Sequence, residues 1–199
     1  MPKELPPFIE LPSWLNTPLA PLNTDARERA RARQQQLTKP LGSLGRLETL
    51  AEQFAGWQGI EQPSLERIRL CVFAADHGIA VQGVSAYPRE VTAQMVSNFC
   101  AGGAAVSVLG KRYRADFRVV NLGCVSPPPS HPTLRDCTIA SGTADFTREP
   151  AMTEAQLRQA LTIGREQVLD AEVELFVGGD MGIGNTSSAS ALQAALLGL

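Results

Sequence analysis

Three short, continuous runs of apolar residues constrain the fold of this 199-residue chain more than any other feature. They occupy residues 68–75, 117–123 and 174–179. A strand that is buried on both faces of a parallel sheet has this pattern, whereas a half-buried strand alternates apolar and polar residues. Helical patterns separate the runs, at 91–99, 104–112 and 153–170. The alternation predicts an α/β fold in which helices flank a Rossmann-like parallel sheet.

The chain divides into three segments by composition. Residues 1–23 carry six of the fourteen prolines and predict an extended N-terminal arm. Residues 24–60 are rich in helix formers and predict a small helical subdomain. The remainder, 61–199, is the predicted α/β domain, and its last helical pattern stops without polar C-terminal residues. We therefore expect this domain to be incomplete at its C-terminal end.

Composition excludes several classes of partner. A formal net charge of -2 leaves no basic field to hold a nucleic-acid backbone or an anionic membrane. The N-terminus has no continuous apolar segment of the kind found in secretory signals, and no later run approaches the length of a membrane span. The four cysteines form no C-x-x-C pair. Reduced thiols in a cytoplasmic protein are the expectation.

The motif GGDMGIGNTSS, residues 178–188, joins a predicted strand to a predicted helix. Its glycines expose successive backbone N–H groups at a helix N-terminus, where anions bind. The spacing resembles a P-loop, but Asn185 stands where the phosphate-binding lysine would be, which disfavours a nucleoside triphosphatase. Two interpretations remain open, namely a site for one phosphate and a tight turn without a ligand.

A second motif, residues 73–96, contains Asp76 and His77 directly after the first predicted strand. Parallel sheets place their ligand crevice at such strand ends. Asp76 could cap the turn while His77 bonds to backbone, and no further histidine lies nearby, so we expect no metal site. The loop 83–88 and the helix that follows it could line a flat aromatic pocket, or could be ordinary core.

Four motifs in order resemble the nicotinate-nucleotide:dimethylbenzimidazole phosphoribosyltransferase family. They are KPLGSLGRLETLA at 39–51, FAADHGIAVQGVSAYPREVTAQMV at 73–96, GTADFTREPAMT at 142–153, and the glycine motif at 178–188. The resemblance implies a Rossmann-like large domain and a smaller helical domain. It also implies a cytoplasmic homodimer that uses no cofactor or metal. Its activity would transfer phosphoribose from nicotinate mononucleotide to dimethylbenzimidazole in cobalamin biosynthesis.

The resemblance and the motif positions together assign three groups of residues. The acceptor base is expected against Ser85, Tyr87, Gln94 and Met95. The phosphate and ribose are expected at Asp180, Gly182, Ile183, Gly184, Asn185 and Thr186. Asp76, His77 and Gly78 are expected to support the site. The family's general base is a glutamate in the C-terminal portion, beyond Leu199, so this chain has no assigned catalytic residue.

Two residues depart from the family pattern within the matched region. Asp180 stands where a glutamate is expected, which keeps the charge but shortens its reach. Asn121 stands where an acid is expected after the second strand, and an amide cannot act as a base.

The first hypothesis for the function is that the chain is a fragment of the transferase. A non-catalytic homologue that binds a mononucleotide or a benzimidazole is the alternative, and an unstable fragment without function is a third.

Overall fold

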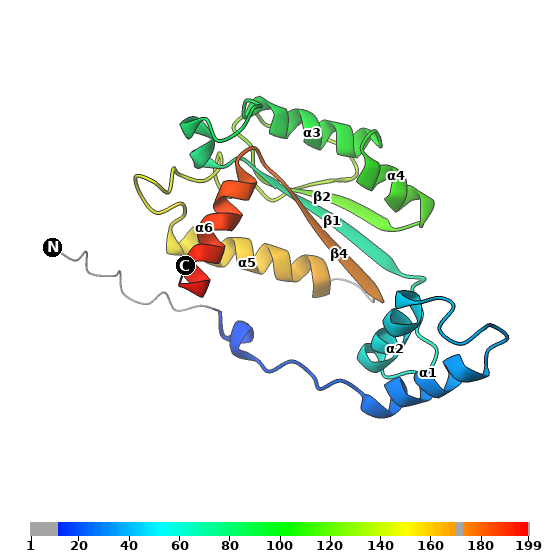
Figure 1. Ribbon diagram of the computed structural model, residues 1–199. Coiled ribbons are helices and arrows are strands. Elements are labelled where there is room, and N and C mark those ends of the chain that lie inside the picture. Colours follow the sequence, from blue (N-terminus) through cyan, green and yellow to red (C-terminus); the bar gives the residue numbers. More distant parts are fainter. Residues whose placement is uncertain (1–11, 170–172, 199) are drawn as a thin grey trace. The chain divides into compact units, whose positions relative to one another are not determined.

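The computed structural model describes residues 12–169 and 173–198 (Figure 1). These residues form two compact units, one at Pro12–Glu66 and a larger one that begins at Arg67. Residues 1–11, nearly half of the predicted N-terminal arm, lie outside the described part of the chain.

The smaller unit is a pair of helices, α1 at Thr24–Gln36 and α2 at Arg46–Gln58, preceded by a short 3-10 helix at Ser13–Asn16. The Asn23 side chain caps α1 by accepting a hydrogen bond from the Ala26 amide at 2.9 Å. Gly59 ends α2 in the left-handed conformation that glycine adopts without strain.

Small residues let α1 and α2 approach closely. Ala26 and Ala30 of α1, and Ala55 and Gly56 of α2, are the buried positions of the two helices. A Cβ at Gly56 would come within 2.7 Å of Leu22 Cδ1, so the absence of a side chain at Gly56 leaves room for the segment that precedes α1. The contact between the two helices therefore rests on small residues, because α1 has no long apolar stripe.

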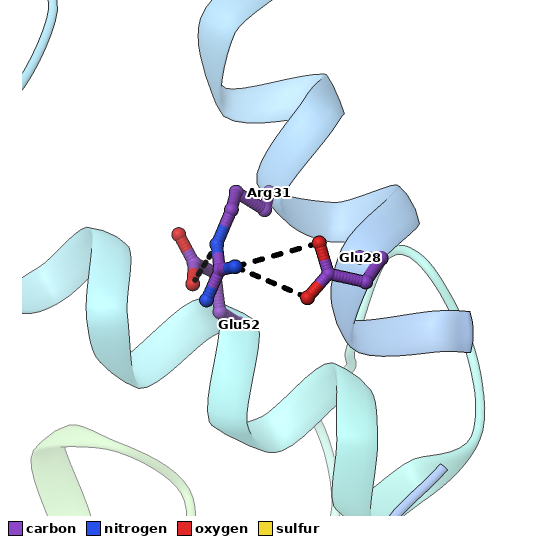
Figure 2. Close-up of polar contacts among 3 residues, drawn as sticks. All are labelled: Glu28, Arg31 and Glu52. Carbon is purple, nitrogen blue, oxygen red and sulfur yellow. Dashed lines mark hydrogen bonds and ion pairs between the residues drawn. The ribbon is translucent and has the colours of Figure 1, made fainter. Parts of the chain in front are cut away.

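One ion pair joins the two helices, from Arg31 of α1 to Glu52 of α2, and a second links Arg31 to Glu28 within α1 (Figure 2). Arg31 Nη1 lies 3.1 Å from Glu28 Oε1, and Arg31 Nε lies 3.1 Å from Glu52 Oε2. Because Arg31 and Glu28 are largely exposed, the pairs contribute little stability and mainly orient the helices.

The larger unit is built on a parallel sheet of four strands in the order β3-β2-β1-β4. The strands are β1 at Ile68–Ala75, β2 at Asp116–Gly123, β3 at Leu134–Asp136 and β4 at Leu175–Met181. β1 is paired on both sides, so that Val72 lies opposite Val119 of β2 and Gly179 of β4. The carboxyl ends of β1, β2 and β4 therefore meet at one edge of the sheet.

Helices cover both faces of the sheet (Figure 1). One face carries α3 at Glu90–Ala101 and α4 at Ala105–Arg112, and the other carries α5 at Glu154–Leu169 and α6 at Asn185–Leu197. Alternate residues of β1 serve the two faces, as strand geometry requires. Leu70, Val72 and Ala74 join the core beneath α3. On the other face the buried Arg69 donates to the Gln167 carbonyl of α5 at 2.9 Å.

The sequence predictions of fold class and of the main elements are confirmed. The three apolar runs are β1, β2 and β4, and the helical pattern at 153–170 is α5. A capping box begins α5, with the Thr153 amide 2.8 Å from Gln156 Oε1. Three short elements were not predicted: the strand β3 and the 3-10 helices at Ser13–Asn16 and Gly78–Gln82. In the described part of the chain, no helix combines the length and apolar character needed to cross a bilayer.

Candidate functional site

The carboxyl-end edge of the sheet gathers most of the predicted site residues. Asp76, His77 and Gly78 follow β1 directly, and the glycine loop 182–184 joins β4 to α6. Because both strands are parallel neighbours, the two segments come together although they lie about a hundred residues apart in the sequence. A third segment, the loop 142–153, also reaches this edge through contacts with residues 76–78.

Asp76 ties three loops together. Its side chain is buried, and Oδ2 accepts a hydrogen bond from the Val125 amide at 2.7 Å. Its backbone amide donates to the Gly123 carbonyl at 2.9 Å, and its carbonyl accepts from the Thr143 amide at 3.0 Å. The second oxygen, Oδ1, is buried without a hydrogen-bond partner among the described residues. The buried Asp76 therefore holds together the segments that follow β1 and β2 and the loop 142–153.

His77 is half-buried, and its Nδ1 lies 2.9 Å from the Ser188 hydroxyl of α6. The expected bond from this side chain to backbone is replaced by this bond to a side chain on the neighbouring helix. Burial lowers the pKa of His77, and the negative charges of Asp180 and Asp76 oppose that shift only in part. The ring is therefore neutral near pH 7 and carries one N–H.

Gly78 is packed against the loop 142–153. Its amide donates to the Thr143 hydroxyl at 3.1 Å, and a Cβ at this position would lie 2.3 Å from the Ala144 carbonyl carbon. The absence of a side chain at Gly78 thus lets the loop approach the end of β1.

The backbone of the glycine motif makes several hydrogen bonds within the protein. The Ile183 amide donates to the Thr92 hydroxyl of α3 at 3.2 Å, and the Asn185 amide donates to the Gly182 carbonyl at 3.0 Å. The Thr186 amide donates to Asn185 Oδ1 at 2.9 Å. Gly184 has φ of 91°, a value at which a side chain would be strained. The motif is thus a well-bonded turn that also opens the helix α6.

Asp180 is engaged with the same motif. Its Oδ2 accepts a hydrogen bond from Asn185 Nδ2 at 2.5 Å, across the base of the loop. The carboxylate is exposed, and so is Thr186, at the first turn of α6. The loop therefore presents one carboxylate and one hydroxyl to solvent beside a helix N-terminus.

The four residues predicted for the acceptor base lie in and after the loop 83–88. The Ser85 hydroxyl accepts a hydrogen bond from the Tyr87 amide at 3.2 Å. Tyr87 and Gln94 are exposed, whereas Met95 packs against the core beneath α3. The ordinary-core interpretation therefore holds for Met95, and Tyr87 and Gln94 are available at the surface.

Three adjoining cavities open at this edge of the sheet, on the face that carries α5 and α6. Their volumes are about 290, 280 and 200 Å³. Apolar side chains make up most of their walls, including Phe73, Leu122, Phe146, Met152 and Leu192. His77 is the residue that lines all three. Apolar walls with a few polar groups are typical of small-molecule sites.

Sequence reasoning assigned no role to Thr143, Met152 or Ser188, although all three line these cavities. Thr143 and Met152 belong to the motif at 142–153, and Ser188 belongs to the glycine motif, so both motifs pointed to the segments that line the cavities. Which side chains of a loop face the cavity depends on its contacts with Asp76 and Gly78, and these follow from the folded structure. Among the described residues, no three or more His, Cys, Asp or Glu side chains are grouped in a way that could hold a metal ion.

Comparisons with known proteins agree over most of the chain. A family model described as "Phosphoribosyltransferase" matches residues 19–199. Nicotinate-nucleotide-dimethylbenzimidazole phosphoribosyltransferase of Pseudomonas putida (strain W619) is 53% identical over 190 residues, which are 94% of this chain and 54% of the relative. The enzyme of the same name from Pseudomonas fluorescens (strain Pf-5) is 52% identical over 190 residues, with the same coverage.

Solved structures that resemble this chain belong to the same kind of phosphoribosyltransferase. The crystal structure of CobT from Thermus thermophilus matches with a TM-score of 0.80 and 45% identity, over 88% of this chain and 54% of that one. The nicotinate-nucleotide-dimethylbenzimidazole phosphoribosyltransferase from the same organism matches with a TM-score of 0.82 and 45% identity, over 89% and 55%. The chain spans about half the length of these relatives.

Proposed function

Because the chain belongs to this phosphoribosyltransferase family, we propose that it forms the N-terminal part of an enzyme that transfers phosphoribose from nicotinate mononucleotide to 5,6-dimethylbenzimidazole. The products are α-ribazole 5′-phosphate, for the nucleotide loop of cobalamin, and nicotinate. The observation that carries the proposal is identity of 53% over 94% of the chain with a relative named for these substrates.

The chemistry of this transfer sets what the protein must supply. Nicotinate leaves from a pyridinium and needs no strong acid. The benzimidazole must lose its ring proton while its other nitrogen attacks the ribose carbon, so a positioned carboxylate is required as general base. The reaction inverts the configuration at that carbon. The resemblance places the base beyond Leu199, so this chain contributes binding surfaces and not the proton acceptor.

We place the nucleotide phosphate at the N-terminus of α6. The positive end of the helix dipole and the exposed Thr186 hydroxyl favour a dianion there. Binding through the Thr186 amide requires that this amide leave Asn185 Oδ1, which costs one local hydrogen bond. Asp180 carries negative charge and would repel phosphate. Its carboxylate is therefore assigned to the ribose hydroxyls.

We place the acceptor base against Ser85, Tyr87 and Gln94, with Met95 in the core behind them. The exposure of Tyr87 and Gln94 supports this placement, because an aromatic wall and an amide can both reach a ligand there. Gln94 is suited to hold one ring nitrogen while the other gives up its proton. A cytoplasmic homodimer is the proposed state of the complete enzyme, as the family resemblance implies.

The test compares the full-length protein, of which this chain forms the N-terminal half, with the 199-residue chain alone. Product formation is followed by chromatography of α-ribazole phosphate and nicotinate. The full-length protein is expected to form both products at equal rates. The chain alone is expected to be slower by at least about a hundred- to ten-thousand-fold, because it lacks the general base. A full-length protein that binds both substrates but forms no product would contradict the proposal.

A further inference from the structure

His77 lies at the centre of the site, and the proposed chemistry gives it no task. It lines each of the three cavities at the carboxyl-end edge of the sheet. It comes from the end of β1, while the nucleotide is placed at the loop and helix that follow β4. A half-buried polar ring at this position connects the two segments.

The first connection is the hydrogen bond between His77 Nδ1 and the Ser188 hydroxyl, at 2.9 Å. Ser188 lies in the first turn of α6, and its amide donates to the Gly184 carbonyl at 3.3 Å. The bond thus joins the end of β1 to the first turn of α6. The proposed function places the nucleotide phosphate at the N-terminus of this helix.

The second connection is a close contact with the glycine loop. A Cβ built on Gly182 would lie 2.7 Å from His77 Cδ2 and 2.8 Å from Nε2. A Cβ on Gly184 would lie 3.5 Å from His77 Cβ. The imidazole therefore packs directly against the backbone of the loop, and the loop cannot move towards β1 while the ring is in place.

These contacts favour a positioning role over proton transfer. Nδ1 lies 2.9 Å from the Ser188 hydroxyl, and the Cδ2–Nε2 edge of the ring lies beside Gly182. The acidic groups that act on the ring are Asp180 and Asp76, and burial outweighs them in setting its pKa. With Nδ1 engaged by Ser188 and one edge of the ring packed on Gly182, His77 holds the loop in place through its contacts.

We infer that His77 is a positioning residue of the nucleotide site, which fixes the glycine loop and the first turn of α6 through Ser188 and Gly182. The inference rests on the proposed function, because that function places the nucleotide at this loop. It adds a residue from β1 to a site that is otherwise formed by the segment after β4.

Two conservative variants separate the two ring nitrogens in the full-length enzyme. Asn at position 77 places a polar atom near the position of Nδ1, and Gln places one near that of Nε2. His77→Ala, His77→Gln and Ser188→Ala are each expected to raise the KM for nicotinate mononucleotide about two- to ten-fold, the effect of one neutral hydrogen bond. His77→Asn is expected to restore most of the affinity. The kcat and the KM for dimethylbenzimidazole should change little in all of them.

The double variant His77→Ala with Ser188→Ala is expected to be no worse than His77→Ala alone, because His77→Ala already removes the bond that Ser188→Ala removes. The inference is wrong if wild type is active and His77→Asn is as impaired as His77→Gln. It is equally wrong if kcat falls at unchanged KM, or if both KM values rise together as Tm drops. A wild-type enzyme without transfer activity contradicts the proposed function, and this result is read before any variant is compared.

Discussion

At the scale of single residues, Asn121 explains why an amide can replace the acid that the family pattern leads one to expect. It is buried on β2, and its Nδ2 donates to Asp136 Oδ1 and to the Thr138 hydroxyl, both at 3.0 Å. Its Oδ1 accepts from the Gly123 amide at 3.1 Å. Every polar atom of the side chain is therefore used to join β2 to β3 and the residues after it. The side chain acts in the fold, and Asn121 is not among the residues that line the three cavities.

Restoring the expected acid should destabilise this protein. Asn121→Asp removes the amide donor and places a second carboxylate beside Asp136, so we expect a loss of about 1 to 3 kcal/mol in the free energy of unfolding at pH 7. The pKa of Asp136 is lowered by Thr138 and, after the opposing effect of burial, by Asn121. In the wild type this stabilisation is present above the unfolded pKa of an aspartate and is lost as the pH falls through the folded pKa.

Urea denaturation at pH 7 and pH 5 measures the effect. In the variant, the loss should shrink towards pH 5, because a carboxyl at position 121 whose pKa is raised by burial and by Asp136 regains a donor when protonated. The matched control is Asn121→Asp with Asp136→Asn, which restores a donor and acceptor pair and should recover part of the stability. An Asn121→Asp protein as stable as wild type at pH 7 would refute this account of the residue.

At the scale of elements, two glycines of the α/β unit have opposite effects on stability. A Cβ at Gly182 would lie 2.2 Å from the Ala75 carbonyl oxygen, which belongs to the end of β1. At Gly164, within α5, a Cβ would meet nothing within 4 Å. Gly182 is therefore required by packing, in addition to any need for a ligand to approach, whereas Gly164 only weakens its helix.

Alanine at the two positions tests this difference. Gly182→Ala should lower the free energy of unfolding by about 1 to 3 kcal/mol, because backbone must shift to admit the methyl group. Gly164→Ala should raise it by up to about 1 kcal/mol through higher helix propensity. Thermal unfolding followed by circular dichroism measures both. A Gly182→Ala protein with unchanged Tm would mean that the end of β1 and the glycine loop are not in close contact.

The elements that the sequence predicts well are those with a long periodic pattern. β1, β2 and β4 lie within two residues of their predicted bounds because continuous apolar runs mark them. β3 has three residues after a proline-rich loop, too few to produce a pattern. In α2 the large residues Leu47 and Leu50 are exposed, while the small residues Ala55 and Gly56 are the buried positions. Small residues carry little hydrophobic signal, yet they decide how closely two helices approach.

The candidate site was predictable in location but not in detail. Motifs after strand ends correctly brought Asp76, His77 and the glycine loop to one edge. The bond between His77 and Ser188 joins residues 111 positions apart, and no local pattern could indicate it. In the same way, the amides of Ile183 and Thr186 were expected to be available for an anion, and the structure shows them bonded within the protein.

At the scale of the whole molecule, the chain combines a helical unit and an α/β unit that carries the site. It spans about half the length of its relatives. The proposed function gives this chain two binding surfaces, one for the nucleotide at the loop 182–186 and one for the acceptor base at residues 85–95. Two separate binding surfaces within one chain can be mapped without any catalytic activity.

The most direct test is a titration of the isotopically labelled chain, with the chemical shift of each backbone amide followed by NMR. Nicotinate mononucleotide is predicted to shift the amides of 182–186, and to shift those of 85–95 little. Dimethylbenzimidazole is predicted to do the reverse. Shifts at 85–95 on addition of the nucleotide, with the loop 182–186 unaffected, would contradict the assignment of the nucleotide to the N-terminus of α6.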